Sequence, residues 1–487
     1  MKSPTPTTTF LKYSELFIFL GLIIFLSLSV SIIGFNGLYG QDGHDYLHFS
    51  RSIKNFINSG IPISHYLHPF AFPFLGYLLT FICFNDIFAM QLVSILSLAF
   101  LFIYLRRLII LTHNSQKHLN IYLISFLIFS PYVLRFGILI MSDMLCTVLC
   151  TAAFYHSIKY SKTKIPQDLI LTIIFSTIAF QTRYAAWVIL LFPAYLLIKT
   201  ILINKKYIYL LFSLLMIGIF FLPEYLLRHR LLIFDLDNPD PEQSYHLNTS
   251  AWSVLNFFKR DFINSDGESH YLLPNILCSF INLIHPAYLF CGIIFLFFFR
   301  KQDISSKPET KLTFASIIIY LLFLSGLTYQ ISRYPLLTFP FVLLLFYPAF
   351  LRIMEKYFTS SGKRMILFSF VVILQLSFFI YSIRIIYQLN QTELKVANVL
   401  QKYKGKTIYT CSIDIALQTY IPNKLINLYY NNISTPEANS LLLYNQKEFT
   451  DHWGTYHPDK TYQQLSKENN LVKIESLPND WELYEIK

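Results

Sequence analysis

Charged residues are scarce in this chain: only 14% of its 487 residues are charged, whereas 54% are hydrophobic. A soluble protein of this length cannot bury so much apolar side chain, so the composition excludes a soluble globular enzyme. The same composition predicts a polytopic membrane protein. The 47 phenylalanines and 34 tyrosines suit helices that pack in lipid, with aromatic belts at both interfaces.

Cysteine is also sparse, and five of the six cysteines lie in or beside apolar segments. Only Cys411 lies in a polar part of the chain, so the sequence predicts no disulfide framework. The formal net charge of +11 does not indicate a nucleic-acid partner. The basic residues are dispersed between apolar runs, where membrane topology explains them.

Eleven apolar runs have about the length that a bilayer requires, and they predict an all-α polytopic membrane domain of about 11 transmembrane helices over residues 1–387. The run 69–84 is also apolar, but it follows His68-Pro69 and contains Pro73, so we predict a short re-entrant or juxtamembrane helix there. The predicted spans are 14–35, 87–105, 119–138, 142–158, 167–182, 184–201, 205–227, 275–299, 312–331, 334–353 and 365–387.

The distribution of basic residues predicts the orientation of these spans. Most lysines and arginines between spans fall in segments that are cytoplasmic if the N-terminus is cytoplasmic, as the positive-inside rule requires. The short loops on the other side carry little beyond Arg135, Arg183 and Arg333. The sequence therefore predicts a multi-pass protein of the plasma (inner) membrane, with a cytoplasmic N-terminus and two long extracytoplasmic loops at 36–68 and 228–274.

The composition becomes polar after residue 387, and residues 388–487 predict a small outward-facing α/β domain. This part contains no phosphate-binding glycine loop, no metal-ligand spacing and no nucleophile motif. Helical patterns occur around 393–403 and 461–468. The predicted strands cover 407–411, 425–429, 440–443, 471–475 and 481–486.

The first long loop contains two carboxylates, Asp42 and Asp45, at the start of an amphipathic pattern that predicts a helix to Asn58. Gly60 supplies a stop signal. Such a helix is too polar to span a bilayer and suits its interface, where it would hold both carboxylates at the membrane surface. A second interfacial helix is predicted over 252–262.

Two histidines of the first helix, His44 and His48, lie four residues apart, a spacing that suits two imidazole ligands of a metal ion. No further ligand at close spacing completes the set. We therefore predict no metal and no cofactor, and a divalent metal stays an alternative that the sequence does not support.

The few charged residues at the outer ends of spans, Asp143, Arg183, Glu224 and Arg333, fall on the same side of the membrane as Asp42. Ionisable groups at membrane depth are costly and are functional by default, although a single interfacial arginine also suits pairing with lipid phosphate. A carboxylate can deprotonate an acceptor hydroxyl or amine. An arginine can bind a lipid phosphate and stabilise the charge that develops as it leaves. The set predicts transfer from a phosphate-linked lipid donor.

Four short motifs follow one another along the chain: QDGHDYL at 41–47, HPFAFPFL at 68–75, MSDM at 141–144 and SRYPL at 332–336. They resemble, in order, the Asp-Glu-x-x-Tyr pattern, the His-Pro-Pro-Leu stretch, the second-loop acid and the late Arg-Tyr-x-x-Pro motif of the GT-C superfamily. These proteins are integral-membrane glycosyltransferases. The resemblance is closest to the bacterial relatives of protein O-mannosyltransferases and to aminoarabinose transferases.

The resemblance implies a role for each of these residues. Asp42 is the expected base that activates the acceptor, and Asp143 is an assisting acid. Gly43 stands where the family has a second acid, so the paired carboxylate must come from Asp45 or Asp143, and Phe70 replaces the second proline. The expected substrate-binding residues are Arg183, Arg333, Tyr334, His68 and Tyr46.

We therefore predict an inverting glycosyltransferase. It would take its sugar from a polyprenyl-phosphate donor in the membrane lipid and transfer it to a cell-envelope acceptor, which is a glycan, a lipid or a protein. One alternative is a transporter or flippase of lipid-linked saccharides, which would place charge near the bilayer midplane in broken, repeated helices. Two others are a lipid-linked polysaccharide polymerase and a catalytically silent membrane scaffold.

Overall fold

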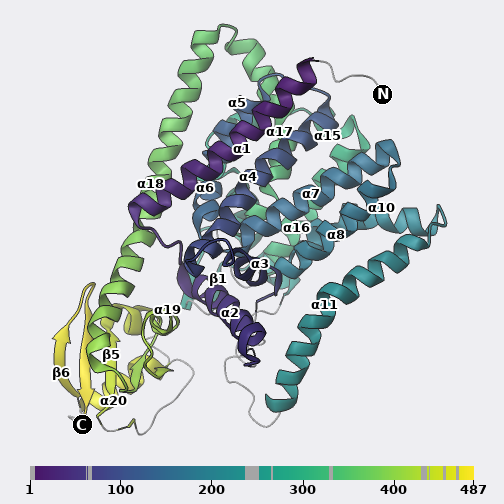
Figure 1. Cartoon of the computed structure of the whole chain (residues 1–487). Coiled ribbons are helices and arrows are strands. Elements are labelled where there is room, and N and C mark those ends of the chain that lie inside the picture. Colours follow the sequence, from purple (N-terminus) through teal and green to yellow (C-terminus); the bar gives the residue numbers. More distant parts are fainter. Residues whose placement is uncertain are drawn as a thin grey trace.

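The computed structural model describes residues 6–61, 63, 68–235, 252–264, 267–327, 333–428, 436–437, 439–452, 457–467 and 471–487. These residues form a bundle of helices with a small mixed β-sheet at one end (Figure 1). The start of helix α1 (Pro6–Ile33) lies at the opposite end of the bundle from the sheet and from helix α2 (Figure 1). The polar C-terminal residues and the polar first loop therefore gather at the same end.

The first half of the chain is helical throughout. Its elements are α1 (Pro6–Ile33), α2 (Gly40–Ser59), α3 (Ala71–Leu79), α4 (Asp86–His113), α5 (Leu119–Leu123), the π-helical η1 (Ile124–Ile128), α6 (Pro131–Ile138), α7 (Ser142–Thr163), α8 (Pro166–Thr182), α9 (Ala186–Ile189), α10 (Leu191–Leu202) and α11 (Ile208–Asp235).

The second half of the bundle is more broken. It comprises η2 (Val254–Phe257), β1 (Asp261–Asn264), β2 (Gly267–His270), α13 (Asn275–Ile284), α14 (Gly292–Phe298), α15 (Lys301–Ser305), α16 (Pro308–Ser325), η3 (Tyr334–Leu337), α17 (Phe339–Tyr357) and α18 (Ser361–Leu400).

Several helices are built to cross a membrane, so the chain is an integral membrane protein. Among the described residues, four stretches have the length and hydropathy of a span: Glu15–Ile33 in α1, all of α4, all of α16, and the stretch from Ser361 to Tyr403 that contains α18. The α5–η1 segment and α6 would make a fifth span, bent by 69°. The full count of eleven spans and their orientation stay predictions.

Two predicted spans are interrupted at prolines. Pro131 begins α6 after the break that follows η1, and Pro286 lies between α13 and α14. Proline has no backbone N–H and its ring clashes with the preceding turn, so a helix cannot continue through these positions without a kink. The apolar segment after His68 forms only the nine-residue α3, which rises about 14 Å and is too short to cross, as predicted.

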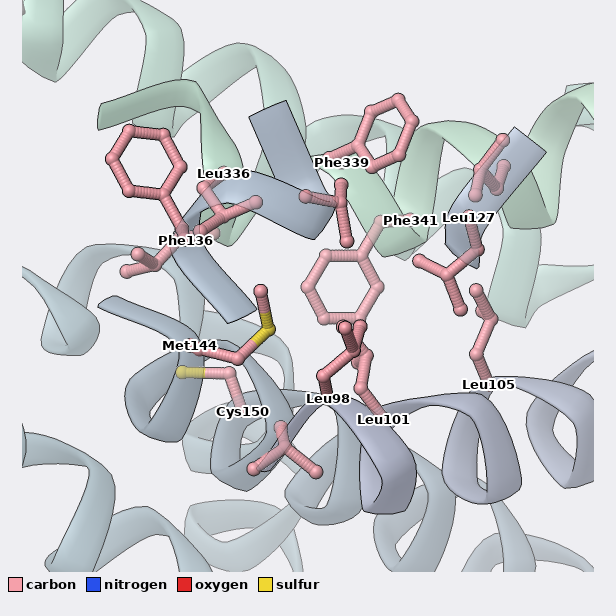
Figure 2. Packing of buried hydrophobic residues seen from close by; sticks show 14 of the residues in the cluster. Leu98, Leu101, Leu105, Leu127, Phe136, Met144, Cys150, Leu336, Phe339 and Phe341 are labelled. Atoms are coloured by element: carbon pink, nitrogen blue, oxygen red, sulfur yellow. The ribbon is translucent and has the colours of Figure 1, made fainter. Parts of the chain in front are cut away.

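The core of the bundle is apolar and closely packed. Figure 2 shows Phe341 of α17 beside Leu98 and Leu101 of α4, and all three side chains are fully buried. The ring centroids of Phe154 of α7 and Phe341 lie 4.3 Å apart. This packing makes α4, α7 and α17 a rigid frame for the polar segments at the end of the bundle.

Helix α18 continues for 40 residues from the bundle into the C-terminal domain, passing without a break through the predicted boundary at residue 387. The domain has a five-stranded sheet in the order β4-β3-β5-β7-β6, in which β3 pairs in parallel with β4 and β5. The predicted strands and the second predicted helix of this domain are confirmed. Its elements are η4 (Gln401–Tyr403), β3 (Ile408–Thr410), α19 (Asp414–Tyr420), β4 (Leu425–Asn427), β5 (Leu441–Asn445), the π-helical η5 (Lys447–His452), α20 (His457–Lys467), β6 (Leu471–Ser476) and β7 (Trp481–Ile486).

The prediction of a second interfacial helix over 252–262 was wrong. The segment contains only the short 3₁₀ helix η2 and the start of strand β1. Trp252 is held instead by the bundle, because its indole Nε1 donates to the carbonyl oxygen of Phe323 at 2.9 Å. This tertiary contact takes priority over the apolar spacing that favoured a helix.

Candidate active site

The segment before α2 is tied to the segment before α7, which brings two distant acids to the same end of the bundle. Gly37 has a φ of +72°, and a Cβ there would lie 2.7 Å from Gln91 Nε2 and 2.8 Å from the Ile138 carbonyl oxygen. Only glycine suits this left-handed, close approach. The Ile140 N–H donates to the Gly37 carbonyl oxygen at 2.8 Å. Three residues beyond Ile140, Asp143 lies in the first turn of α7.

The predicted helix is confirmed as α2, and Gly60, the predicted stop, follows its last residue in the left-handed conformation. Its position in the bilayer interface stays a prediction. Asp42 lies in its first turn. Tyr46, Phe49 and Ile53 of the predicted apolar face are buried against the rest of the protein, whereas Phe56 and Ile57 at its end are exposed. The buried residues of α2 therefore fix the orientation of the helix from which Asp42 projects.

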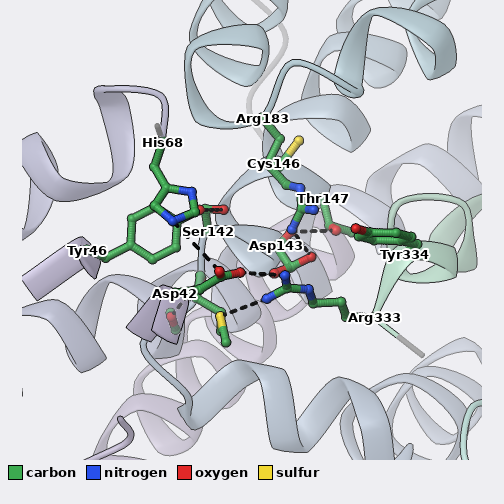
Figure 3. Close-up of polar contacts among 12 residues, drawn as sticks. Asp42, Tyr46, His68, Ser142, Asp143, Cys146, Thr147, Arg183, Arg333 and Tyr334 are labelled. Carbon is green, nitrogen blue, oxygen red and sulfur yellow. Dashed lines mark hydrogen bonds and ion pairs between the residues drawn. The ribbon is translucent and has the colours of Figure 1, made fainter. Parts of the chain in front are cut away.

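Asp42 forms an ion pair with Arg333, which follows α16 almost 300 residues later in the sequence (Figure 3). His68 Nε2 lies 3.7 Å from the Asp42 carboxylate and 3.8 Å from that of Asp45. The Asp42 side chain is 29% exposed and that of Arg333 is 14% exposed. The pair is therefore sheltered but still partly accessible to solvent.

A second ion pair lies beside the first. Asp143, whose side chain is only 1% exposed, pairs with Arg183 at the end of α8 (Figure 3). The guanidinium carbon atoms of Arg183 and Arg333 lie 5.5 and 6.0 Å from the centre of the Tyr334 ring, so both arginines are close to this ring. Arg333 also approaches the Met141 sulfur at 3.3 Å.

An aromatic wall borders the acids on the α2 side. The hydroxyls of Tyr46 and Ser142 share a hydrogen bond of 2.7 Å, which links α2 to the first residue of α7. The Tyr46 ring lies 4.4 Å from the His68 ring and 5.0 Å from that of Phe72, measured between centroids. The wall therefore fixes His68 beside Asp42.

The charges of this cluster determine its ionisation. Burial alone would raise the pKa of Asp42, but the charges of Arg333 and His68 and the hydrogen bond from Arg333 lower it to about 2. Burial by itself would lower the pKa of Arg183 and Arg333, but the neighbouring acids raise the pKa of both guanidinium groups above the ordinary value. Burial and the charge of Asp42 raise the pKa of Tyr46, so its hydroxyl stays neutral. At neutral pH Asp42 is therefore ionised, and both guanidinium groups are charged.

The structure brings together seven of the eight residues predicted for the site and places Asp45 at the edge. Asp45 is 34% exposed on its side chain and reaches the cluster through His68. Ser332, the first residue of the fourth motif, and the side chain of Glu224 lie outside the described residues. The remaining seven are Asp42, Tyr46, His68, Asp143, Arg183, Arg333 and Tyr334.

Sequence reasoning assigned no role to Ser142, Met141 or Tyr320. Ser142 and Met141 stand inside a quoted motif and touch Tyr46 and Arg333, respectively. The Tyr320 hydroxyl donates to the Tyr334 carbonyl oxygen at 3.2 Å and supports the turn that carries Arg333. The sequence offers no signal for Tyr320, because it lies on a span like many other tyrosines.

The histidine pair that had been weighed as a metal site has another partner. His44 Nδ1 and His48 Nε2 both face the Thr419 hydroxyl of α19, at 2.8 and 3.1 Å. In the part of the chain that the structure describes, no group of three histidine, cysteine or acidic side chains could hold a metal ion.

Comparison with known proteins identifies the class of fold. No family model matches the sequence, and no curated protein matches it. Solved structures nevertheless share its fold, and among them are two of ArnT from Cupriavidus metallidurans, an aminoarabinose transferase. The shared fold agrees with the resemblance of the four motifs to the GT-C superfamily.

The ArnT structure bound to undecaprenyl phosphate matches with a TM-score of 0.63 and 9% sequence identity, over 96% of this chain and 97% of that one. The structure of ArnT in the apo state matches with a TM-score of 0.59 and 10% identity, over 95% and 97%. The likeness includes the C-terminal domain, because nearly the whole of both chains is matched. At this identity it defines the fold alone.

Proposed function

We propose that this protein is an inverting glycosyltransferase that moves a sugar from a polyprenyl-phosphate donor to a cell-envelope acceptor, which is a glycan, a lipid or a protein. The observation that carries the proposal is the meeting of two acid–arginine pairs at the end of a membrane bundle, from chain positions 42, 143, 183 and 333. The fold supports it, since ArnT has the same fold and was solved bound to undecaprenyl phosphate.

Arg183 and Arg333 would bind the phosphate of the donor. A sugar linked to a polyprenyl phosphate is a phosphodiester with one negative charge, and the phosphate gains a second charge as the sugar leaves. Two guanidinium groups close to one ring offer planar, always-charged donors for these oxygens. They would stabilise the charge that develops in the transition state.

Asp42 would act as the base only once the donor is bound. With a pKa of about 2, Asp42 is too weakly basic to accept a hydroxyl proton efficiently. A phosphate that takes over Arg333 removes the partner that holds this pKa down, so burial then raises the pKa of Asp42. Donor binding would thereby make the weakly basic Asp42 carboxylate basic enough to accept the acceptor's proton.

The proposed reaction is a single displacement. The acceptor oxygen or nitrogen attacks the anomeric carbon, its proton passes to Asp42, and the bond between that carbon and the phosphate oxygen breaks. The phosphate leaves with the electron pair of that bond. Attack on the face opposite to the phosphate inverts the configuration of the sugar.

The other residues of the site would orient these groups. Asp143 is almost fully buried and paired with Arg183, so it would hold that guanidinium rather than exchange protons itself. Tyr46 and His68 would line the sugar, and Asp45 lies at the edge through which an acceptor would enter. The site would face the extracytoplasmic side of a bacterial plasma membrane.

The test is sugar transfer by the purified protein in liposomes that contain radiolabelled polyprenyl-phosphate sugars and envelope extracts as acceptors. Asp42→Asn should lower the rate by at least about 100-fold, the low end of the contribution of a general base. Glu355→Gln, which alters an exposed pair with Lys117, is the matched control and should retain the wild-type rate. Wild-type rates for Asp42→Asn would exclude Asp42 as the base. Movement of the labelled lipid between leaflets without transfer would favour a flippase instead.

A further inference from the structure

Helix α2 has a second polar face, and this face contacts the C-terminal domain. His44 and His48 are four residues apart and therefore lie on one side of the helix. Their nitrogens Nδ1 and Nε2 lie 2.8 and 3.1 Å from the same atom, the Thr419 hydroxyl oxygen. Thr419 belongs to α19, more than 370 residues later in the chain. One hydroxyl thus joins two side chains of the helix that carries Asp42.

The connection that leads into α2 is held from the same direction. The Asn36 side-chain amide donates to the Tyr420 hydroxyl at 3.0 Å. The Asn390 amide of α18 donates to the Leu38 carbonyl oxygen at 2.8 Å. These bonds lie six and four residues before Asp42, so the start of its helix is fixed by the C-terminal part of the chain.

The Thr419 hydroxyl can bond both imidazoles at once. A hydroxyl has one hydrogen to donate and lone pairs that accept, so Thr419 can donate to one ring nitrogen and accept from the other. The far side of the His44 ring faces Glu393, whose carboxylate lies 3.6 Å from Nε2, and both side chains are buried, at 1% and 6% exposure. The two bonds to Thr419 therefore tie this face of α2 to α19.

We propose that Thr419 is a positioning residue of the active site, through which the C-terminal domain holds α2 in the rotation that turns Asp42 toward Arg333. The inference rests on the proposed glycosyl transfer and assigns the C-terminal domain a part in it. Successive helix residues are about 100° apart, so Asp42 and His44 point to nearly opposite sides of α2. The hydrogen bonds from Thr419 to His44 and His48 on one side of α2 therefore set the direction of Asp42 on the other side.

A valine at position 419 has the shape of threonine but cannot donate or accept a hydrogen bond. It would leave the two imidazole nitrogens without their partner in a buried contact, which is costly. The donor phosphate would still meet Arg183, which Asp143 of α7 holds, and Arg333, which also contacts Met141 beside α7. The variant should therefore bind the donor normally and transfer slowly.

The experiment compares Thr419→Val, Thr419→Ser and the surface control Gln418→Ala on the same helix, in the full-length protein in nanodiscs. Thr419→Val should lower kcat about tenfold and leave KM for the donor within about twofold, because one aligned hydrogen-bonded contact is lost. Thr419→Ser keeps the hydroxyl and should restore the rate. Hydrogen–deuterium exchange should become faster in α2 of Thr419→Val and stay unchanged in α4.

Each contrary outcome is distinct. Wild-type kcat and wild-type exchange in Thr419→Val would overturn the proposal. So would an equal loss in Thr419→Ser, or faster exchange in α4 as well as α2, since either would show a general loss of structure. If the wild-type protein transfers no sugar from any donor, the proposed function fails, while the exchange of α2 still decides whether Thr419 holds that helix.

Discussion

The ion pair between Asp42 and Arg333 should couple strongly in a double-mutant cycle. The pKa of Asp42 falls from 3.8 to about 2 in the folded protein. One pKa unit corresponds to about 1.4 kcal/mol, so ionised Asp42 gains about 2 to 3 kcal/mol from its surroundings after the penalty of burial. Most of this gain should depend on Arg333, the first of the favourable charges that act on Asp42.

The cycle consists of Asp42→Asn, Arg333→Gln and the double variant, each unfolded reversibly in mixed micelles at pH 7. We expect each single variant to lose about 2 to 3 kcal/mol of stability and the double variant to lose about the same amount, not the sum. The coupling free energy should therefore be about 2 kcal/mol, somewhat reduced because the Asp42 side chain is 29% exposed.

The chain offers a matched control in the exposed pair of Lys117 and Glu355, whose side chains are 54% and 57% exposed and 2.8 Å apart. Its coupling should stay below about 1 kcal/mol, because solvent screens exposed charges. Additive losses for Asp42 and Arg333, or a coupling no larger than that of the exposed pair, would refute the assigned ion pair.

Three further predictions concern other parts of the molecule. Gly37→Ala should cost about 2 to 4 kcal/mol in the same unfolding assay, because its Cβ would meet Gln91, whereas Gly40→Ala, with open space around it, should cost about 1 kcal/mol. Burial raises the pKa of Asp414 to about 6, so stability that is complete below pH 3.8 is lost as the pH rises through 6. Asp414→Asn should therefore stabilise β3 and β5 by up to about 3 kcal/mol at pH 8 and by little at pH 4, as measured by hydrogen exchange. In transfer assays, kcat/KM should stay level as the pH is lowered to about 4, because Asp42 is ionised in the free protein. The decline of kcat on acidification should begin at a higher pH, because donor phosphate has then taken Arg333 from Asp42. Identical acid limbs of kcat and kcat/KM would contradict this exchange of partners.

Hydrophobic patterning was sufficient to predict the general architecture. The length of the apolar runs predicted the long helices α4 and α18, and the strand patterns predicted all five strands of the C-terminal sheet. Gly60 ended α2 where a left-handed residue was required. These features depend on local periodicity and on local backbone chemistry, which a single sequence contains.

The contacts between distant segments could not be predicted in the same way. The sidedness of the charges predicted that Asp42 and Arg333 share an end of the bundle. It did not predict that Asp42 pairs with Arg333 while Asp143 pairs with Arg183, because pairing depends on helix rotation and packing. Thr419 carried no signal, since its seven-residue helix is too short to show a period.

The breaks in the predicted spans show a related limit. His285-Pro286 was noted within a span, but the length of the irregular stretch between α13 and α14 depends on the packing around it. A backbone carbonyl of this stretch finds its partner in a neighbouring helix, because the Tyr132 N–H of α6 donates to the Ala287 carbonyl oxygen at 3.0 Å. Composition alone does not contain those partners.

The most direct test of the account is the binding of undecaprenyl phosphate, measured by native mass spectrometry of the protein released from nanodiscs. We expect the wild-type protein to retain one lipid phosphate, and Arg183→Gln and Arg333→Gln each to weaken its binding at least about tenfold, since each removes a charge-assisted hydrogen bond. Lys117→Gln, at the other end of the bundle, should bind as the wild type does. Equal binding by all four proteins would contradict the claim that the two arginines form a lipid-phosphate site.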